Sequence, residues 1–279
     1  MDIFALEIFA IAVFAGFFGS LVGLGGGIIV TPALTILFGI DIKYAIGASI
    51  ISVIATSSGS AIAYLKEHLA NIRIAMFLEI GTAIGAITGA FLAGLFSTNM
   101  LYIVFGLFLL YSSWNMFQTL RKSGGVDHHV ETSHPLAEKL QLGGSYFDKS
   151  IGEQKEYKVA GVYGSLIAMF FAGITSGLLG IGAGGFKVLA MDVFMKLPMK
   201  VSTATSNFMI GVTAAASAAI YFFRGDIDPK ITAPVALGVL AGSLVGARVM
   251  QYLPNKTIRL IFIPVITFIS IQMIWKGIF

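Results

Sequence analysis

The chain alternates long apolar stretches with short polar connections. Each long stretch is close to the roughly 20 residues that an α-helix needs to cross the hydrocarbon core of a bilayer. The long stretches are at 4–24, 45–65, 74–96, 100–118, 159–181, 203–223, 231–253 and 258–275. Two shorter apolar pieces, 28–38 and 186–195, reach only about half of that thickness. We therefore predict an all-α polytopic membrane protein with eight full-length apolar helices and two short ones.

One polar segment divides the apolar stretches into two sets of four. We predict a first membrane repeat at 1–118, a cytoplasmic loop at 119–158 and a second membrane repeat at 159–279. Within the loop, "GGSYFDKSIGEQKEYKV" alternates aromatic and turn-forming residues, a pattern typical of a small hairpin. The loop also holds three histidines between 128 and 134, but their spacing matches no motif of defined metal geometry, and we predict no metal.

The two membrane sets are copies of one unit. A shift of 157 residues, which takes Gly16 to Gly173, aligns them without a gap from residue 14 to residue 105. The shift also pairs Gly23, Gly25 and Gly27 with Gly180, Gly182 and Gly184, Lys43, Ser49 and Thr56 with Lys200, Ser206 and Thr213, and Gly81, Gly85 and Gly89 with Gly238, Gly242 and Gly246. A single register over so many positions indicates an internal duplication, which is the pattern of many secondary transporters.

The relative orientation of the two copies depends on the number of crossings. Four crossings in each half would make the copies parallel, and counting the short pieces as a fifth crossing would make them inverted. Both arrangements place the 119–158 loop in the cytoplasm, because Lys and Arg are more numerous on its side of the membrane. The chain termini are cytoplasmic in the first arrangement and external in the second.

The composition agrees with a membrane protein and excludes other classes. Hydrophobic residues make up 57% of the chain and charged residues 11%, whereas soluble domains average about 25% charged residues. The net charge of +4 is explained by basic cytoplasmic loops, so the predicted partner is the lipid bilayer and not a nucleic acid. The absence of cysteine excludes disulfides and thiolate metal sites. No nucleophile elbow, Walker loop, HExxH motif or Rossmann fingerprint occurs, and we predict neither an enzyme nor a cofactor.

Two glycine clusters interrupt the apolar sequence at corresponding points. They read "GSLVGLGGGIIVTP" at 19–32 and "SGLLGIGAGGFKVL" at 176–189. A glycine inside a helix costs roughly 1 kcal/mol relative to alanine, so each cluster should unwind one helix and begin a short new one. The N-terminus of a helix has unpaired N–H groups and a partial positive charge, and glycine lets an anion approach them closely. We predict an anion site where the two clusters meet, formed by Gly23, Gly25, Gly26 and Gly27 with Gly180, Gly182, Gly184 and Gly185. The alternative is that the glycines only permit tight helix packing.

Polar residues next to the clusters are further candidates for this site. Lys187 lies at membrane depth, where a lysine is costly and therefore a functional candidate. It could give a charge to the bound anion, or reach an interface or pair with Asp192. Ser49, Ser206 and Asn207 could line the site, because hydroxyl and amide groups bind an oxyanion, or they could join helices together.

Two further segments, "GTAIGAITG" at 81–89 and "GVLAGSLVG" at 238–246, repeat a small residue at every fourth position. Such faces are typical of closely packed membrane helices, and this is the role we predict for them. Glu79 precedes the first face. It could act as a proton or cation relay, or it could be an interfacial carboxylate.

Taken together, the glycine clusters, the ungapped duplication and the second-helix beginnings "GAS" at 47–49 and "ATS" at 204–206 resemble the TauE/SafE family of permeases, often labelled sulfite exporters. The resemblance covers 16–118 and 159–275, and "GSLVGLGGGIIVTPAL" is its most specific part. It implies transport of small sulfur-containing anions such as sulfite, thiosulfate or organosulfonates, without ATP, across a prokaryotic cytoplasmic membrane, with export as the expected direction.

The transport mechanism expected of such a permease is alternating access around the glycine-lined site. Coupling would be to a proton or to the membrane potential. Two alternatives remain open from the sequence. One is a transporter of a different small anion, such as a carboxylate, and the other is an anion channel without alternating access.

Overall fold

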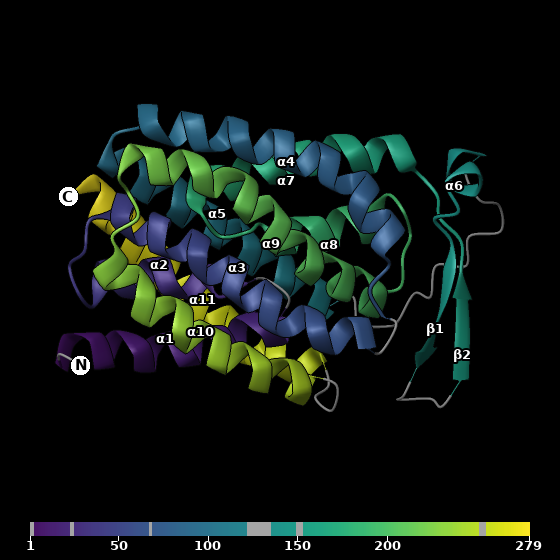
Figure 1. Ribbon diagram of the computed structural model, residues 1–279, viewed down its shortest axis with the longest axis horizontal. Helices are drawn as coiled ribbons and strands as arrows, with labels where there is room; N and C mark the ends of the chain where they lie inside the picture. The colour runs from purple at the N-terminus through teal and green to yellow at the C-terminus, as the bar shows by residue number, and fades with distance from the viewer. Residues whose placement is uncertain (1–2, 23–24, 67–68, 122–134, 149–152, 251–254) are drawn as a thin grey trace.

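The protein is a bundle of long helices with a small strand pair at one end (Figure 1). The computed structural model describes residues 3–22, 25–66, 69–121, 135–148, 153–250 and 255–279, and it has eleven helices and two strands there. The helices are α1 (Ile3–Val22), α2 (Gly27–Ile36), α3 (Ile42–Lys66), α4 (Ile72–Leu95), α5 (Thr98–Arg121), α6 (Pro135–Lys139), α7 (Val162–Leu179), α8 (Gly184–Val193), α9 (Met199–Arg224), α10 (Pro229–Met250) and α11 (Asn255–Ile278). The strands are β1 (Gly144–Asp148) and β2 (Glu153–Tyr157).

Every apolar stretch that the sequence marks is helical. The eight long stretches are α1, α3, α4, α5, α7, α9, α10 and α11, and the two short pieces are α2 and α8. Within the described residues, six helices are each long and apolar enough to cross a membrane, namely α1, α3, α4, α7, α9 and α10. The prediction of an all-α polytopic membrane protein is therefore confirmed.

The outer surface of the bundle suits lipid. Leu95, Phe223 and Trp275 are large apolar side chains with 81%, 87% and 65% of their surface exposed. Exposed apolar patches of this kind would drive aggregation in water but match the acyl chains of a bilayer. Because lipid offers no hydrogen bonds, helices that satisfy their backbone groups internally are the form that such a surface requires.

The two small-residue faces pack two helix pairs at close range. In α4, a Cβ added to Gly85 would overlap the carbonyl oxygen of Phe170 in α7, and a Cβ added to Gly89 would overlap that of Ile174. On the other side of the bundle, the glycines of α10 approach the backbone of α1 in the same way, at Gly238, Gly242 and Gly246. The predicted packing role of both faces is thus confirmed, and it fixes α7 on α4 and α1 on α10.

Corresponding helices of the two halves run in opposite directions (Figure 1). The first helix begins and the last helix ends at one end of the bundle, here called the terminal end, and β1, β2 and α6 lie at the opposite, hairpin end. Helix α3 starts at the terminal end, whereas α9 starts at the hairpin end. The shift of 157 takes the bounds of α2, Gly27–Ile36, to those of α8, Gly184–Val193. These directions fit the inverted arrangement rather than the parallel one.

The segment between the two membrane halves docks on the start of α4. Strands β1 and β2 pair antiparallel, with Gly144 opposite Tyr157, so the predicted hairpin is confirmed. The side-chain amide of Asn71, which caps α4, donates to the Leu142 carbonyl and to the Tyr157 hydroxyl at 2.9 Å each. The backbone N–H of Asn71 donates to Thr205 of α9 at 3.0 Å. The three loop histidines lie outside the described residues, and no group of three metal-ligating side chains occurs inside them.

The arrangement of the two ends can be tested with single cysteines, because the chain has none of its own. We expect Leu140→Cys at the hairpin end and Phe279→Cys at the terminal end to react with a membrane-impermeant maleimide from opposite sides. Both side chains are exposed, at 39% and 84% of their surface. Labelling in intact cells and in inverted vesicles makes the measurement, and labelling of both positions from one side would contradict the inverted directions.

Candidate functional site: two glycine turns at the centre of the bundle

Two helical hairpins, α1–α2 and α7–α8, enter the bundle from opposite ends and turn back near its middle. The turns use backbone conformations that favour glycine. Gly25 of the first turn has φ +76°, and Gly180 and Gly182 of the second have +66° and +74°. Ala183 is also left-handed, at φ +47°, whereas its counterpart Gly26 is right-handed. An alanine in that region costs roughly 1 kcal/mol, so the second turn holds a strained backbone at Ala183.

The two turns meet on the same pair of side chains. A Cβ on Gly25 would lie 3.2 Å from Cδ1 of Ile210 and 3.4 Å from Cγ2 of Val53. A Cβ on Gly182 would lie 2.9 Å from Cγ1 of Val53 and 3.1 Å from Cβ of Ile210. Val53 and Ile210 are completely buried and correspond to each other under the shift of 157. The structure thus brings the two glycine clusters together, and apolar side chains fill the space between them.

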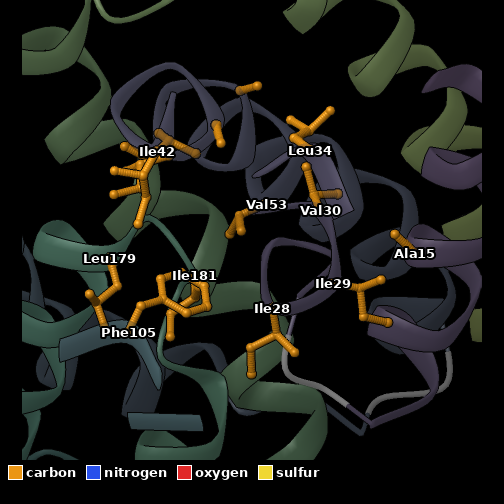
Figure 2. Packing of buried hydrophobic residues seen from close by; sticks show 14 of the residues in the cluster. Ala15, Ile28, Ile29, Val30, Leu34, Ile42, Val53, Phe105, Leu179 and Ile181 are labelled. Carbon is orange, nitrogen blue, oxygen red and sulfur yellow. The ribbon is translucent and has the colours of Figure 1, made fainter. Parts of the chain in front are cut away.

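Figure 2 shows how this centre continues into the apolar core. Val53 lies between the two hairpins, with Ile28 and Ile181 near it and with Leu179 and Phe105 to one side. All of these side chains are at most 3% exposed. The centre is therefore closed by tight apolar packing in this conformation.

Ser49 and Ser206 hold the second turn in place. The hydroxyl of Ser49 in α3 donates to the Gly180 carbonyl at 2.7 Å, and that of Ser206 in α9 donates to the Gly184 carbonyl at 3.1 Å. Gly27, the first residue of α2, lies against this contact, since an added Cβ would overlap Oγ of Ser49 and come within 2.9 Å of the Gly180 oxygen. Ser49 therefore donates to a carbonyl of the turn, and Ser206 donates to the carbonyl of the first residue of α8.

Asn207 differs from the serines because its side-chain amide is unused. The residue is completely buried, and neither its Nδ2 nor its Oδ1 has a hydrogen-bond partner among the described residues. Ile210 lies three residues further along α9, so the two side chains share one helix face. The amide therefore lies one turn from the contact between Ile210 and Gly25, on the same face of α9.

Lys187 and Glu79 form a buried pair inside the bundle. The Lys187 ammonium is completely buried, donates to Oγ1 of Thr213 and lies 4.0 Å from Oε2 of Glu79. Oγ1 of Thr213 donates in turn to Oε1 of Glu79 at 2.5 Å. The alternative that Lys187 reaches an interface is therefore wrong, because its ammonium is completely buried. Glu79 is only 8% exposed, and its carboxylate contacts Thr213 and Lys187. No ion pair between Lys187 and Asp192 occurs in the part of the chain that the structure describes.

The remaining predicted residues have plainer positions. Gly26 is the N-cap of α2, and its carbonyl accepts from the N–H groups of Ile29 and Val30. Gly185 is the partly buried second residue of α8, and Gly23 lies outside the described residues. Sequence reasoning missed the central pair Val53 and Ile210, although the repeat register aligns them. It also missed the link from Lys187 to Glu79, for which a pair of ionisable residues at membrane depth was the available signal.

Comparison with known proteins shows the family to which the chain belongs. The family model for the sulfite exporter TauE/SafE matches residues 8–273. The chain belongs to the TauE/SafE family. A probable membrane transporter protein of Bacillus subtilis, YunE, is 29% identical over 272 residues, which is 95% of each chain. A second from the same organism, YdhB, is 24% identical over 91% of this chain and 92% of its own.

The similarity extends to archaea. A probable membrane transporter protein of Methanocaldococcus jannaschii is 24% identical over 93% of this chain and 91% of its own. No solved structure matches. This member of the TauE/SafE family is thus a multi-pass membrane transporter, a class in which paired interrupted helices near the middle of the membrane are common.

The contact between Gly27 and Ser49 predicts a specific interaction between two substitutions. Gly27→Ala should lower stability by about 1–3 kcal/mol, because the new methyl group overpacks the turn. Ser49→Ala should cost about 0.6 kcal/mol, the average for a hydrogen bond between membrane helices. Because Ser49→Ala removes the oxygen that the methyl group meets, the double variant should be more stable than the two single losses predict. Thermal unfolding in detergent measures this, and simple additivity would contradict the geometry.

Proposed function

We propose that this protein is a secondary transporter of small sulfur-containing anions, such as sulfite, thiosulfate or organosulfonates, and that it exports them across a prokaryotic cytoplasmic membrane. Membership of the TauE/SafE family supports the transporter class and the anion class. The single observation that carries the site is the buried amide of Asn207 beside the glycine turns, which has no hydrogen-bond partner in the described part of the chain.

The physical cost of that amide supports a ligand role. A buried polar group without a hydrogen bond costs about 1–3 kcal/mol. An apolar residue would avoid this cost, as Ile50 does at the corresponding position of α3. The two N–H bonds of an asparagine amide suit the oxygen atoms of a sulfite, thiosulfate or sulfonate group. Because the amide is neutral, it can bind such anions whatever their charge.

The residues around the two glycine turns favour an anion site on the α9 side of the bundle centre. At the second turn, a Cβ on Gly180 would meet Ile46 and Ile50, so apolar side chains of α3 cover this glycine. The corresponding residues of α9 are Thr203 and Asn207. We therefore place the anion between this polar face of α9 and the first glycine cluster, where the N-terminus of α2 adds a favourable helix dipole.

Alternating access follows from the arrangement of the hairpins. The helical hairpins α1–α2 and α7–α8 enter from opposite ends of the bundle, and the glycine turns of both contact Val53 and Ile210. Movement of one hairpin away from this pair would open the site to one side while the other hairpin keeps the opposite side closed. The apolar contact thus acts as the barrier between the two aqueous solutions.

The hairpin end is proposed to face the cytoplasm. Basic residues at or beyond the helix ends there are more numerous than at the terminal end. The hairpin end has Arg73, Arg121, Lys139, Lys155, Lys158, Lys196, Lys200 and Arg248, and the terminal end has Lys43, Arg224, Lys230 and Lys276. This orientation makes the 119–158 segment cytoplasmic and the termini external.

The role of Asn207 predicts a variant that separates transport from stability. Asn207→Ile should reduce anion exchange at least tenfold while leaving the thermal unfolding midpoint unchanged or higher, because it removes an unsatisfied buried amide. Exchange of radiolabelled thiosulfate in proteoliposomes and unfolding in detergent are the two measurements. Ser206→Ala is the matched control, since it removes a hydroxyl that satisfies the Gly184 carbonyl and should lower the midpoint. Normal exchange by Asn207→Ile would contradict the site.

The substrate class is tested by competition. Flux of radiolabelled sulfite into proteoliposomes should saturate and be inhibited by thiosulfate and sulfoacetate, with little effect of acetate. Inhibition by acetate alone would indicate a carboxylate transporter. A large single-channel current without stimulation by counterflow would indicate an anion channel.

A further inference from the structure

Three side chains from three helices form a buried polar cluster beside the helical hairpin α7–α8. Glu79 comes from α4, Thr213 from α9 and Lys187 from the first turn of α8. The Thr213 hydroxyl accepts from the Lys187 ammonium and lies 2.5 Å from Oε1 of Glu79 and 2.9 Å from the Met209 carbonyl oxygen. Oε2 of Glu79 has no hydrogen-bond partner among the described residues. One carboxylate oxygen is thus open to a proton.

The hydroxyl can serve both protonation states of the carboxyl group. It carries a single hydrogen, so it donates either to Glu79 or to the Met209 carbonyl. When Glu79 is a carboxylate, Thr213 donates to it. When Glu79 is protonated, Thr213 can donate to Met209 instead and still accept from Lys187. The geometry therefore needs no rearrangement of the helices to accommodate a proton on Glu79.

The internal duplication does not repeat the complete set of these three side chains. The shift of 157 pairs Thr213 with Thr56, but it pairs Lys187 with Val30 and Glu79 with Ala236. The hydroxyl of Thr56 donates to the Ser52 carbonyl at 2.9 Å, as expected of a helix-packing threonine. Packing of the duplicated unit thus has no need of the ion pair, because the apolar residues Val30 and Ala236 occupy the repeat-related positions. The ion pair therefore points to function.

Other ionisable groups on the packed helices belong to other contacts. Beside Glu79, α4 has Arg73, whose guanidinium donates to Gln141 at the hairpin end. Helix α7 has Tyr163, which is 61% exposed, and α8 has Asp192, which is partly buried. Helix α9 has Lys200 in its first turn, and Tyr221 and Arg224 in its last turn. Of these, Tyr221 donates to the Gly177 carbonyl and Arg224 pairs with Asp226. No described group other than Lys187 forms an ion pair with Glu79.

We propose that Glu79 is the proton-coupling site of the transporter, and that its protonation frees Lys187 to attract the substrate anion. This inference rests on the proposed function. With Glu79 deprotonated, the carboxylate balances the ammonium and the pair is neutral. A proton from the aqueous side to which the site is open converts the carboxylate to a carboxylic acid. The uncompensated positive charge of Lys187 then favours an anion, and the proton and the anion are released together on the other side. Because the two move in the same direction, net export requires an outward gradient of the anion that exceeds any inward gradient of protons.

The position of Lys187 connects protonation of Glu79 with binding of the anion. It is the fourth residue of α8, three residues after Gly184 at the second glycine turn. Long side chains in a helix lean toward its N-terminus, so the ammonium lies over the end of α8 that carries the turn. Ser206 and Thr213 are seven residues apart on one face of α9, and they contact Gly184 and Lys187 of α8. Loss of the ion pair between Lys187 and Glu79 therefore changes the charge at the glycine turn. It also changes the contacts of α9 and α4 with the helical hairpin α7–α8.

The wild-type protein provides the first test. In proteoliposomes loaded with a pH-sensitive dye, an inward gradient of thiosulfate should acidify the lumen, and an inward proton gradient should drive accumulation of radiolabelled thiosulfate. Exchange of labelled for unlabelled thiosulfate at equal pH measures transport without coupling. Exchange without proton movement would overturn the coupling proposal but leave the proposed function intact. Absence of exchange with every sulfur anion would overturn the proposed function and this inference with it.

Glu79→Gln is the decisive variant, because glutamine resembles a permanently protonated glutamate. The variant should exchange thiosulfate at a rate within about threefold of wild type. The accumulation of thiosulfate driven by the proton gradient should fall more than tenfold, and thiosulfate binding should be the same at all pH values. Thiosulfate binding by the wild-type protein should weaken as the pH rises, because deprotonated Glu79 again forms an ion pair with Lys187. Asp226→Asn is the control, since it removes a second buried carboxylate that is paired with Arg224. Retained proton-driven accumulation in Glu79→Gln would overturn the proposal.

Two further pairs of variants keep the proposal testable if Glu79→Gln folds poorly. Lys187→Arg should retain coupled transport, whereas Lys187→Met should lose thiosulfate binding at least tenfold. Thr213→Val should alter the pH dependence of binding, whereas Thr56→Val, its counterpart in the first half, should leave that dependence unchanged. Equal pH profiles for the two threonine variants, or normal binding by Lys187→Met, would contradict the proposal.

Discussion

A backbone that leaves the helical conformation inside a bilayer must give its N–H and C=O groups to other protein atoms, because lipid cannot satisfy them. The rest of this structure depends on that constraint. The carbonyl groups of Gly180 and Gly184 accept from the serine hydroxyls of α3 and α9, and the Gly26 carbonyl accepts within α2. The two helices that supply the serines therefore run through the middle of the bundle, and the two interrupted hairpins rest on them.

The same constraint explains the contact at the centre. Glycine turns leave no side chains of their own to fill the space between them, and Val53 and Ile210 fill it instead. In the proposed mechanism this pair of apolar side chains is the barrier to free passage of an anion, and the proposed binding groups lie one helical turn away. On this proposal, the separation of the barrier from the binding groups would let a helical hairpin move without disrupting the anion site.

The two halves share a scaffold but not their chemistry. Asn207, Lys187 and Glu79 have the apolar counterparts Ile50, Val30 and Ala236. The features that the shift keeps, such as the glycines, Ser49 with Ser206, and Thr56 with Thr213, are those that packing needs. The unmatched polar groups gather around α9 and the hairpin of α7 and α8, with Glu79 contributed by α4 of the first half.

Much of the fold could be predicted from the sequence, because apolar length and glycine position are local properties. All ten apolar stretches are helices, and the hairpin of β1 and β2 forms where aromatic and turn residues alternate. The site was only partly predictable. The unused amide of Asn207 and the pair of Lys187 with Glu79 depend on which helix faces meet, and a single sequence does not specify these. Ser49 and Ser206 show the same limit, since their hydroxyls bind turn carbonyls that only the folded hairpins bring near.

The central claim is that Val53 and Ile210 separate two aqueous routes that open one at a time onto α9. The most direct measurement is the reactivity of Thr203→Cys, one turn from Asn207, with a small membrane-impermeant thiol reagent added to either side of oriented proteoliposomes. The account predicts that a saturating one-sided gradient of thiosulfate slows labelling from the side of higher concentration, and that acetate has no effect. Equal labelling from both sides at once, unaffected by thiosulfate, would show an open pore and contradict the account.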